Sequence, residues 1–279
     1  WWPDGLYTAP TAEAMAWDIE RTKELGFNMI RKHIKVEPSR WYYDCDRLGM
    51  MVWQDMPCIG DYKRHDRADW AQGVDVYGAG RDYYALTPEA EAGYYAEWGD
   101  IIHKFAKFPS IVVWVPFNEG WGQFDTAAAV DFPRAKDPTR LVNAASGGNL
   151  ELCGDIIDVH HYACPAMKAF EGKMINVIGE YGGLGYVVPS HTWQQDENWG
   201  YGKTIETPEE VIELYDQFAG MLETFIQCGC SAAVYTQTTD VEVEINGIMT
   251  YDRLMKIDAS RLKEINTRVI NSLNAMLQQ

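Results

Sequence analysis

The chain has 279 residues, of which 24 are Lys or Arg and 41 are Asp or Glu, and its net charge is −17. Such an acidic sequence, with no Lys/Arg cluster, argues against nucleic acid and anionic membranes as partners. No apolar run reaches the roughly 18 residues that a membrane span needs.

Helical and strand patterns alternate along the chain. Apolar residues at helical spacing, bounded by capping residues, predict helices over residues 11–25, 38–48, 88–108, 125–136, 208–227 and 260–277. Short apolar runs that turn polar at their ends predict strands over residues 27–33, 50–53, 111–115, 140–145, 156–162, 175–180 and 232–236. Residues 58–87 and 181–207 lack periodicity and are predicted to be long loops.

This alternation is typical of a parallel α/β fold, and the length suits one (β/α)8 TIM barrel of roughly 250 residues. The predicted strands are one fewer than a closed barrel needs, so we expect the first strand to be lacking or truncated at or before Trp1. No linker-like stretch divides the sequence, and we expect a single domain over residues 1–279. The start at Trp1 suggests an excised segment and leaves the compartment unassigned.

The stretch from Ile111 to Gly120 reads IVVWVPFNEG and is the most informative part of the sequence. Its apolar first half, rich in Val and Ile, is typical of a strand buried on both faces. Asn118 and Glu119 follow where that strand leaves the core. Because parallel α/β folds carry their chemistry at the carboxyl ends of the strands, these two side chains indicate either a functional site or a helix cap.

Other predicted strands end in the same way. Their polar or aromatic end residues are Arg31, His33, Asp55, Asn118, Glu119, His160, Tyr162, Glu180 and Tyr235. A shared polar end of this kind favours one functional site at the carboxyl-terminal edge over chance capping of individual strands. The 11 Trp and 16 Tyr residues, beside excess carboxylates, indicate a carbohydrate substrate, since sugars present C–H groups to flat rings and hydroxyls to acceptors.

Glu119 and Glu180 are the candidate catalytic pair. Glycoside cleavage needs one carboxylic acid to protonate the leaving oxygen and a second carboxylate to meet the developing oxocarbenium ion. A separation of about 5–5.5 Å between the two carboxyl groups would make the second a nucleophile and the reaction retaining.

Several motifs together resemble the catalytic barrel of glycoside hydrolase family 2, from about residue 17 to about residue 240. They are PSIVVW before Asn118-Glu119, GFNMIRKH and WYYDCDRLGMMVWQDMP in the first third, DPTRLV in the middle, and VIGEYGG around Glu180. The resemblance implies a retaining β-glycosidase of the wider clan A, in which N-terminal β-sandwich domains pack on the barrel of the parent chain.

The resemblance also implies roles for individual residues. Glu119 falls at the acid/base position, Glu180 at the nucleophile position, and Asn118 where the sugar 2-hydroxyl is bound. Tyr162 falls where a tyrosine contacts the nucleophile. Arg31 and His33 fall on a strand that lines the sugar pocket.

The sequence departs from the family at several places; His33, for example, lies two residues after Arg31 rather than the more familiar three. The aromatic residue expected at the end of the last strand matches Tyr235 rather than a Trp, and Gln54-Asp55-Met56-Pro57 replaces a Glu-x-His metal pair. We therefore expect no metal ion and no cofactor. The six cysteines also lack zinc-ligand spacing.

The predicted function is an exo-acting retaining β-glycosidase, with a β-galactoside as the favoured substrate. Beyond the catalytic pair, the predicted sugar contacts are Asn118, Tyr162, Arg31, His33, His160, Asp55, Tyr235 and Trp193. Two alternatives stay open. An endo-acting hydrolase of the same clan would use Trp70, Trp193 and Trp199 as stacking platforms, and a non-catalytic carbohydrate-binding barrel would keep the aromatic residues without needing two opposed glutamates.

Overall fold

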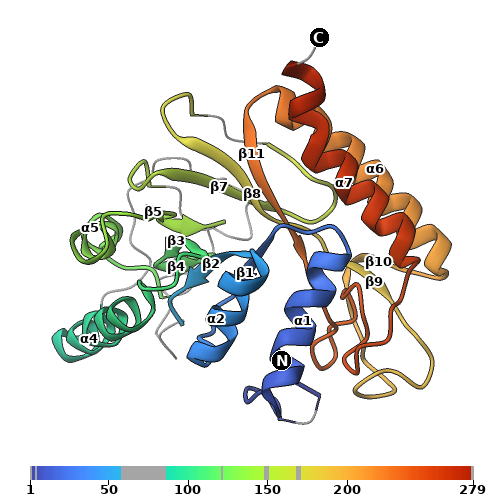
Figure 1. Cartoon of the computed structure of the whole chain (residues 1–279), viewed down its shortest axis with the longest axis horizontal. Helices are drawn as coiled ribbons and strands as arrows, with labels where there is room; N and C mark the ends of the chain where they lie inside the picture. The colour runs from blue at the N-terminus through green and yellow to red at the C-terminus, as the bar shows by residue number, and fades with distance from the viewer. Residues whose placement is uncertain are drawn as a thin grey trace. The chain divides into compact units, whose positions relative to one another are not determined.

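The computed structural model describes residues 2–3, 5–57, 86–120, 122–147, 151–167 and 171–277. The chain forms two compact units (Figure 1). Unit 1 comprises Trp1–Asn28, His160–Met167 and Ile178–Gln279, and unit 2 comprises Met29–Val159 and Lys168–Val177.

Unit 2 is built on parallel strands. Strands β1 (Met29–Lys32), β2 (Met51–Asp55), β3 (Ile111–Val115) and β5 (Leu141–Val142) form a sheet in the order β1-β2-β3-β5. Strand β4 (Phe117–Asn118) pairs in parallel with β6 (Ala145–Ser146). Pro116 separates β3 from β4, because proline has no backbone N–H for the ladder. Since the pairings are parallel, the carboxyl ends of β1, β2 and β3 lie at one edge of the sheet.

Among the described residues, the helices of this unit are α2 (Ser39–Leu48), α4 (Pro88–Phe105) and α5 (Thr126–Lys136). Helix α2 ends at Gly49, which adopts the left-handed conformation that favours glycine. Large rings fill the space between helices and sheet. The Trp98 ring of α4 packs edge-on against Trp114 of β3, with centroids 5.5 Å apart, and both side chains are fully buried. Strand β3 is therefore a core strand, as its apolar sequence predicts.

Strands β7 (Ile156–His161), β8 (Ile175–Gly182) and β11 (Cys230–Thr236) form a sheet in the order β11-β8-β7. The division between the units falls within β7 and β8. Residues Ile156 to Val159 and Val177 to Gly182 are buried, so both strands are core elements for most of their length.

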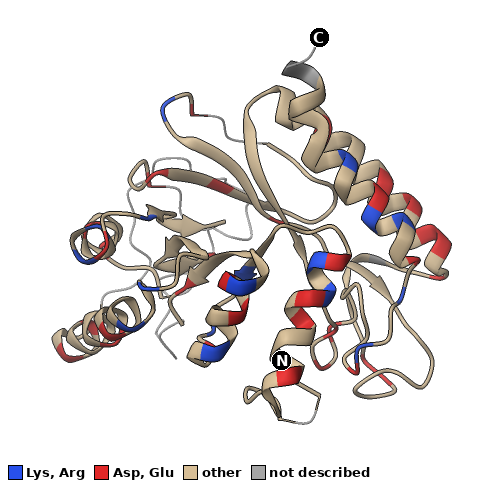
Figure 2. Cartoon of the chain, viewed as in Figure 1, with Lys and Arg blue, Asp and Glu red and all other residues tan. Residues whose placement is uncertain are grey.

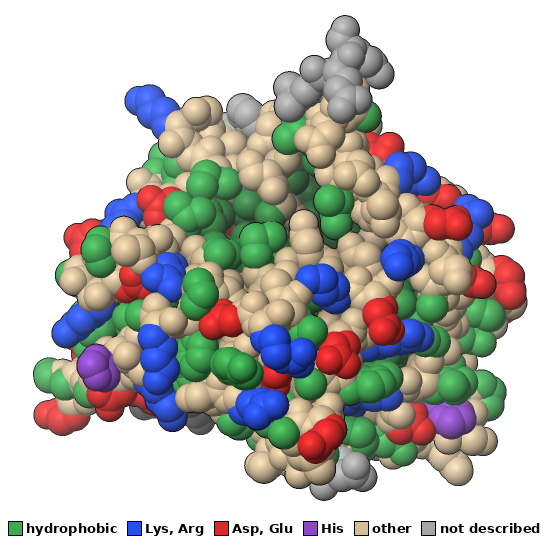
Figure 3. All heavy atoms as spheres, viewed as in Figure 1, with side chains coloured by type: hydrophobic (Ala, Val, Ile, Leu, Met, Phe, Trp, Pro, Cys, Tyr) green, Lys and Arg blue, Asp and Glu red, His purple; other side chains and the backbone are tan. Residues whose placement is uncertain are grey.

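Unit 1 also contains α1 (Ala12–Glu24), α6 (Pro208–Gln227), α7 (Ala259–Leu277) and the parallel strands β9 (Leu184–Tyr186) and β10 (Tyr201–Ile205). Helices α6 and α7 lie side by side (Figure 1). Their apolar faces join one core cluster around Ile178, Phe218 and Leu262. Their outer faces carry interspersed acidic and basic side chains (Figures 2 and 3), of which Arg261 and Arg268 both pair with Asp216.

Most predicted elements agree with the structure to within a few residues at their ends. Two predictions need correction. The predicted loop over residues 181–207 contains the end of β8 and the short strands β9 and β10, which are held by close backbone approach at Gly185 and Gly200 rather than by an apolar run. The predicted strand over residues 140–145 is interrupted and forms β5 and β6. Of the predicted loop over residues 58–87, residues 58–85 lie outside the described residues.

Among the helices that the structure describes, none combines the length and apolar character needed to cross a membrane.

Glu37 is a buried carboxylate in the turn between β1 and α2. Its Oε1 atom lies 2.5 Å from the Lys32 Nζ atom and 2.9 Å from the Lys35 Nζ atom, and its side chain is fully buried. Burial raises the pKa of the Glu37 carboxyl, but the two ammonium groups outweigh burial and hold the pKa below the ordinary value of 4.5.

Replacement of Glu37 by glutamine should destabilise the protein by about 3–5 kcal/mol at pH 7, because two lysines lose their buried counter-charge. A lowered folded-state pKa means that this stabilisation is complete above pH 4.5 and is lost as the pH falls through that lowered value. Urea unfolding of wild type and Glu37→Gln at pH 6 and pH 3 should show the difference shrinking at the lower pH. A difference independent of pH would contradict this assignment. Glu264→Gln, at an exposed position of α7, serves as the control.

Candidate active site

In unit 2, three predicted site residues meet at the carboxyl ends of their strands. The Arg31 guanidinium donates from Nε to Asp55 Oδ1 at 3.2 Å and from Nη2 to Asp55 Oδ2 at 2.8 Å. The same Nη2 donates to Asn118 Oδ1 at 2.7 Å. Arg31 therefore links β1, β2 and β4 and fixes the orientation of the Asn118 amide. Since Asp55 is 1% exposed and engaged by Arg31, it supports the site residues rather than offering a surface to a substrate.

Glu119 follows β4 directly and is half-buried. Its φ of +48° lies in the left-handed region, which is unfavourable for a residue with a Cβ atom and is often found at functional positions. The Glu119 N–H donates to the Ser146 carbonyl at 2.8 Å. This bond extends the parallel pairing of β4 with β6 and so places the glutamate at the end of the sheet.

Behind that contact lies a buried polar cluster that sequence reasoning does not identify. Asp158 Oδ2 accepts from the Ser146 hydroxyl at 2.5 Å and from the Asn143 amide at 2.7 Å. Both acceptor and donors are fully buried. Because Ser146 also accepts the Glu119 N–H, the Asp158 carboxylate supports the backbone that carries Glu119. The polar type of Asn143, Ser146 and Asp158 could have drawn attention to these positions. The sequence does not show that they contact one another, because Asp158 lies 12 residues from Ser146 and 15 from Asn143.

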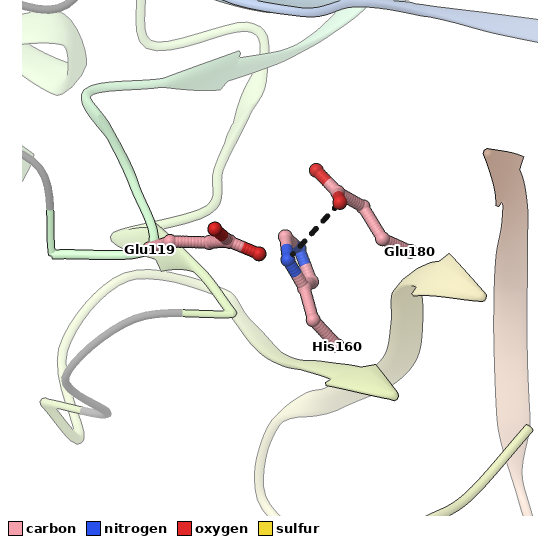
Figure 4. Close-up of side chains that lie close together, drawn as sticks. All are labelled: Glu119, His160 and Glu180. Carbon is pink, nitrogen blue, oxygen red and sulfur yellow. Dashed lines mark ion pairs between the residues drawn. The ribbon is translucent and has the colours of Figure 1, made fainter. Parts of the chain in front are cut away.

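In unit 1, Glu180 is held by two side chains from the end of β7. The Glu180 carboxylate is 7% exposed and accepts a hydrogen bond from the Tyr162 hydroxyl at Oε2. His160 Nδ1 lies 3.5 Å from the same Oε2 atom (Figure 4). Alternate residues of a strand point to the same face, so His160 and Tyr162 both reach Glu180 on the neighbouring strand β8. His161, between them, instead contacts the Cys164 carbonyl at 2.6 Å.

The Tyr162 hydroxyl therefore acts as a hydrogen-bond donor to the Glu180 carboxylate. Burial, and next the negative charge of Glu180, raise the pKa of Tyr162 well above its ordinary value of 10. The phenol stays protonated over the whole working range of an enzyme. It can stabilise the ionised form of Glu180, which is the form that a nucleophile requires.

A second aromatic residue that sequence reasoning missed lies against Tyr162. The Tyr201 ring, at the start of β10, stacks on the Tyr162 ring with centroids 3.5 Å apart and planes inclined by 5°. Trp199 meets Tyr201 edge-on at 5.4 Å and is 43% exposed. The sequence Trp199-Gly200-Tyr201 carried a signal, since a glycine between two aromatic residues often marks a close backbone approach.

The remaining predicted residues occupy different settings. His33 lies 3.7 Å from Asp55 Oδ2 and its side chain is 52% exposed. Trp193 is exposed and packs edge-on against Tyr251. Tyr235 is partly buried and packs against the core cluster of unit 1, with its ring 5.0 Å from the Tyr215 ring of α6. Since side chains alternate along a strand, Thr236 rather than Tyr235 is directed to the opposite face of β11.

Among the described residues, neither unit alone brings together three His, Cys, Asp or Glu side chains close enough to share one ion. Gln54 belongs to the segment that replaces the family's Glu-x-His metal pair. Its buried amide accepts a hydrogen bond from the Tyr42 hydroxyl and donates one to the Lys35 carbonyl.

Comparison with known proteins decides the family. Residues 8–180, more than half of the chain, match the family model described as "Glycosyl hydrolases family 2, TIM barrel domain". The chain belongs to glycoside hydrolase family 2. This confirms the predicted resemblance and the predicted α/β TIM-barrel fold class, and it assigns the chain to a family of glycoside hydrolases.

Curated relatives are similar to about half of the chain, and solved structures are similar to most of it. A β-galactosidase of Clostridium acetobutylicum is 25% identical over 133 residues, which are 48% of this chain and 14% of that protein. A β-galactosidase of Streptococcus thermophilus is 26% identical over 133 residues, 48% of this chain and 12% of that protein.

Two solved structures share the fold. The β-D-glucuronidase of Dictyoglomus thermophilum has a TM-score of 0.67 at 15% identity and covers 92% of this chain and 47% of its own. The β-galacturonidase of Eisenbergiella tayi bound to galacturonate has a TM-score of 0.64 at 18% identity, with 93% and 48% covered. The chain thus spans about half the length of these solved chains and a smaller part of the curated relatives.

The buried Arg31–Asp55 ion pair should contribute strongly to the stability of this family 2 chain. Asp55→Ala should destabilise the protein by about 3–5 kcal/mol, because the Arg31 guanidinium, 2% exposed, loses the carboxylate that compensates its charge. Urea denaturation measures the change. His33→Ala, at the half-exposed neighbour, should cost less than about 1 kcal/mol. An equal decrease in the free energy of unfolding for both variants would contradict a large contribution from the buried pair.

Proposed function

We propose that this chain carries the catalytic barrel of a retaining exo-β-glycosidase, with Glu180 as nucleophile and Glu119 as acid/base. The observation that carries the proposal is the setting of Glu180, a buried carboxylate at the end of a core strand that accepts from Tyr162 and lies beside His160. Family 2 membership supports the reaction class. The Tyr162 hydroxyl, which donates to Glu180, suits a carboxylate that must stay ionised.

The proposed reaction proceeds by double displacement. Glu180 attacks the anomeric carbon while Glu119 gives its proton to the glycosidic oxygen, so the C–O bond to the leaving group breaks and a glycosyl ester forms on Glu180. Glu119, now ionised, takes a proton from water, and the water oxygen displaces Glu180 from the anomeric carbon. Two inversions return the original configuration. This mechanism requires the two carboxyl groups to lie about 5–5.5 Å apart in the working enzyme.

Asn118 is the proposed ligand of the sugar 2-hydroxyl. Arg31 donates to Asn118 Oδ1, and the opposite end of the amide therefore carries the N–H donors. A hydroxyl oxygen on the sugar can accept one of them. Arg31 itself acts through Asn118 and Asp55, while half-exposed His33 and exposed Trp193 are offered as outer contacts.

The favoured substrate is a β-galactoside, since the matched curated relatives named above are β-galactosidases. The two structural neighbours are described as acting on uronides, which makes β-glucuronides and β-galacturonides the natural comparison set. A screen of 4-nitrophenyl β-galactoside, β-glucuronide, β-galacturonide and β-mannoside on the full-length natural protein tests the assignment. Release of nitrophenol fastest from the galactoside supports it. A preferred uronide would overturn the choice of sugar but leave the reaction class standing.

Exposed tryptophans support a second candidate, an endo-acting hydrolase. Trp193 is 41% exposed and Trp199 is 43% exposed, and both lie in the segment between β9 and β10. Aromatic faces of this kind can stack on successive sugars of a chain. Product analysis of a β-linked oligosaccharide separates the two modes, since exo action releases single sugars and endo action releases internal fragments. Sugar binding without any turnover would instead indicate the non-catalytic barrel.

The domain organisation remains a proposal as well. We propose one catalytic domain over residues 1–279, on which N-terminal β-sandwich domains of a longer protein pack. The chain's share of its solved relatives, about half, is consistent with such an arrangement. Limited proteolysis of the full-length protein should yield a stable fragment that corresponds to this chain.

A further inference from the structure

We infer that Tyr201 is a positioning residue for the reaction proposed above, because its ring clamps Tyr162 in the orientation that delivers the phenol to Glu180. The inference rests on the proposed function for its consequence in catalysis. The physical arrangement lies entirely within unit 1.

Backbone hydrogen bonds attach Tyr201 to the end of β8, the strand that carries Glu180. The Tyr201 N–H donates to the Gly183 carbonyl at 2.9 Å, and Gly183 lies three residues after Glu180. The Gly183 N–H in turn donates to the Thr236 carbonyl at 2.9 Å, at the end of β11. Tyr201 is therefore fixed by backbone bonds to the same strand end that carries Glu180, and not by the ring stack alone.

Gly183 leaves space for the rings of both Tyr162 and Tyr201, because it has no side chain. Its φ is +65°, and a Cβ atom there would lie 2.4 Å from Tyr201 Cδ2 and 3.0 Å from Tyr162 Cδ1. A side chain at this position would therefore push the two rings apart or away from Glu180. Gly200, next to Tyr201, is equally constrained, since a Cβ atom there would lie 2.6 Å from the Gly185 Cα atom.

The rings of Tyr162 and Tyr201 stack in a nearly parallel geometry. Aromatic pairs prefer edge-on or offset contacts, and the neighbouring pairs Tyr181–Tyr235 and Trp199–Tyr201 are inclined by 84° and 77°. Tyr162 and Tyr201 instead lie face to face with planes inclined by 5°. This arrangement is less favourable than an offset one, and the backbone bond from Tyr201 to Gly183 helps to hold the ring in it. Tyr162, which follows the end of β7, depends on that rigid surface for its ring plane.

The expected consequence is a loss of catalysis that passes through the Tyr162 hydroxyl. Tyr201→Ala should lower kcat/KM about tenfold for activated and unactivated substrates alike, the size expected for one aromatic contact. Tyr201→Phe keeps the ring but removes the hydroxyl, which also interacts with the Tyr162 side chain, so its activity should fall between those of wild type and Tyr201→Ala. In a Tyr162→Phe background, Tyr201→Ala should cost less than about twofold, because the group that it positions is already absent.

The closing experiment combines this double-mutant cycle with crystal structures of wild type and Tyr201→Ala. The structures should show the Tyr162 hydroxyl moved away from Glu180 in the variant, and Tyr7→Ala, at an exposed tyrosine of the same unit, should leave both contact and rate unchanged. An undisturbed Tyr162–Glu180 contact in Tyr201→Ala, or equal rate losses in both backgrounds, would overturn the inference. Absence of turnover in the wild type would refute the proposed function, while the crystal structures would still decide the clamp.

Discussion

Replacement of Glu180 by glycine should lower kcat/KM by about 10⁴-fold or more for every substrate, whatever its leaving group. The carboxylate that forms the glycosyl ester is gone, and neither Tyr162 nor His160 can replace it as a nucleophile at the anomeric carbon. Initial rates with aryl glycosides measure the loss. Because Glu180 lies on a core strand, the variant also needs a test that separates lost chemistry from lost structure.

Azide provides that test. The space left by the Glu180 side chain admits a small anion, which can attack the anomeric carbon from the vacated side and give a glycosyl azide of inverted configuration. Rescue by azide would show that the rest of the site is intact and that only the nucleophile was missing. Glu197→Gly is the matched control, since Glu197 is exposed in the same unit and has a φ of +61° that glycine tolerates. Full activity in Glu180→Gly without azide would contradict the assignment.

Replacement of Glu119 by glycine should have an effect that depends on the leaving group. Substrates with poor leaving groups need the proton, and their kcat/KM should fall by about 10²–10⁴-fold. Aryl glycosides with strongly acidic phenols leave without assistance, so their kcat/KM should fall less than about tenfold. Glycine is the appropriate replacement because Glu119 has a φ of +48°, where a Cβ atom is unfavourable.

The measurement is kcat/KM across a series of aryl glycosides that differ in the pKa of the phenol. For Glu119→Gly the logarithm of kcat/KM should fall steeply with rising phenol pKa, and for wild type it should change little. Glu89→Gln, in the first turn of α4, provides an exposed glutamate variant in the same unit. An equal loss for all phenols would mean that Glu119 does not donate the proton.

Local sequence patterns predict most of the fold because the relevant interactions are themselves local. Thr11 caps α1 and Thr207 caps α6 through hydrogen bonds to nearby N–H groups, and Gly49 ends α2 in the left-handed conformation. The buried strand β3 is visible in five consecutive apolar residues. By contrast, β9 and β10 depend on close contact between Gly185 and Gly200, fifteen positions apart, which no local pattern records.

The sequence predicts which residue types stand at the strand ends but not which of them contact one another. A polar end on each strand predicts Arg31, Asp55 and Asn118, but only the folded sheet shows that Arg31 joins the other two. The end of β11 shows a different limit, since an error of one residue in an alternating strand moves a side chain to the other face. Tyr235, which was predicted for the site, packs against the core cluster, and its neighbour Thr236 is directed to the opposite face of β11.

Tyr201 illustrates why the support of a site is harder to predict than its reactive groups. Its partners Tyr162 and Gly183 come from different strand ends. The contact between the two rings is possible because Gly183 has no Cβ atom, and not because of any reactive side chain. Asp158 is similar, because it reaches Glu119 only through Ser146. Both residues look like ordinary core or loop residues until the strands are paired.

The central claim is that Glu180 forms the covalent glycosyl intermediate. An activated 2-deoxy-2-fluoro-β-glycoside of the preferred sugar slows hydrolysis of that intermediate, so that the labelled protein can be digested and its peptides identified by mass spectrometry. The account predicts one added sugar per chain, attached to Glu180 in the peptide around VIGEYGG. A sugar attached to a different carboxylate, or inhibition without any covalent label, would contradict it.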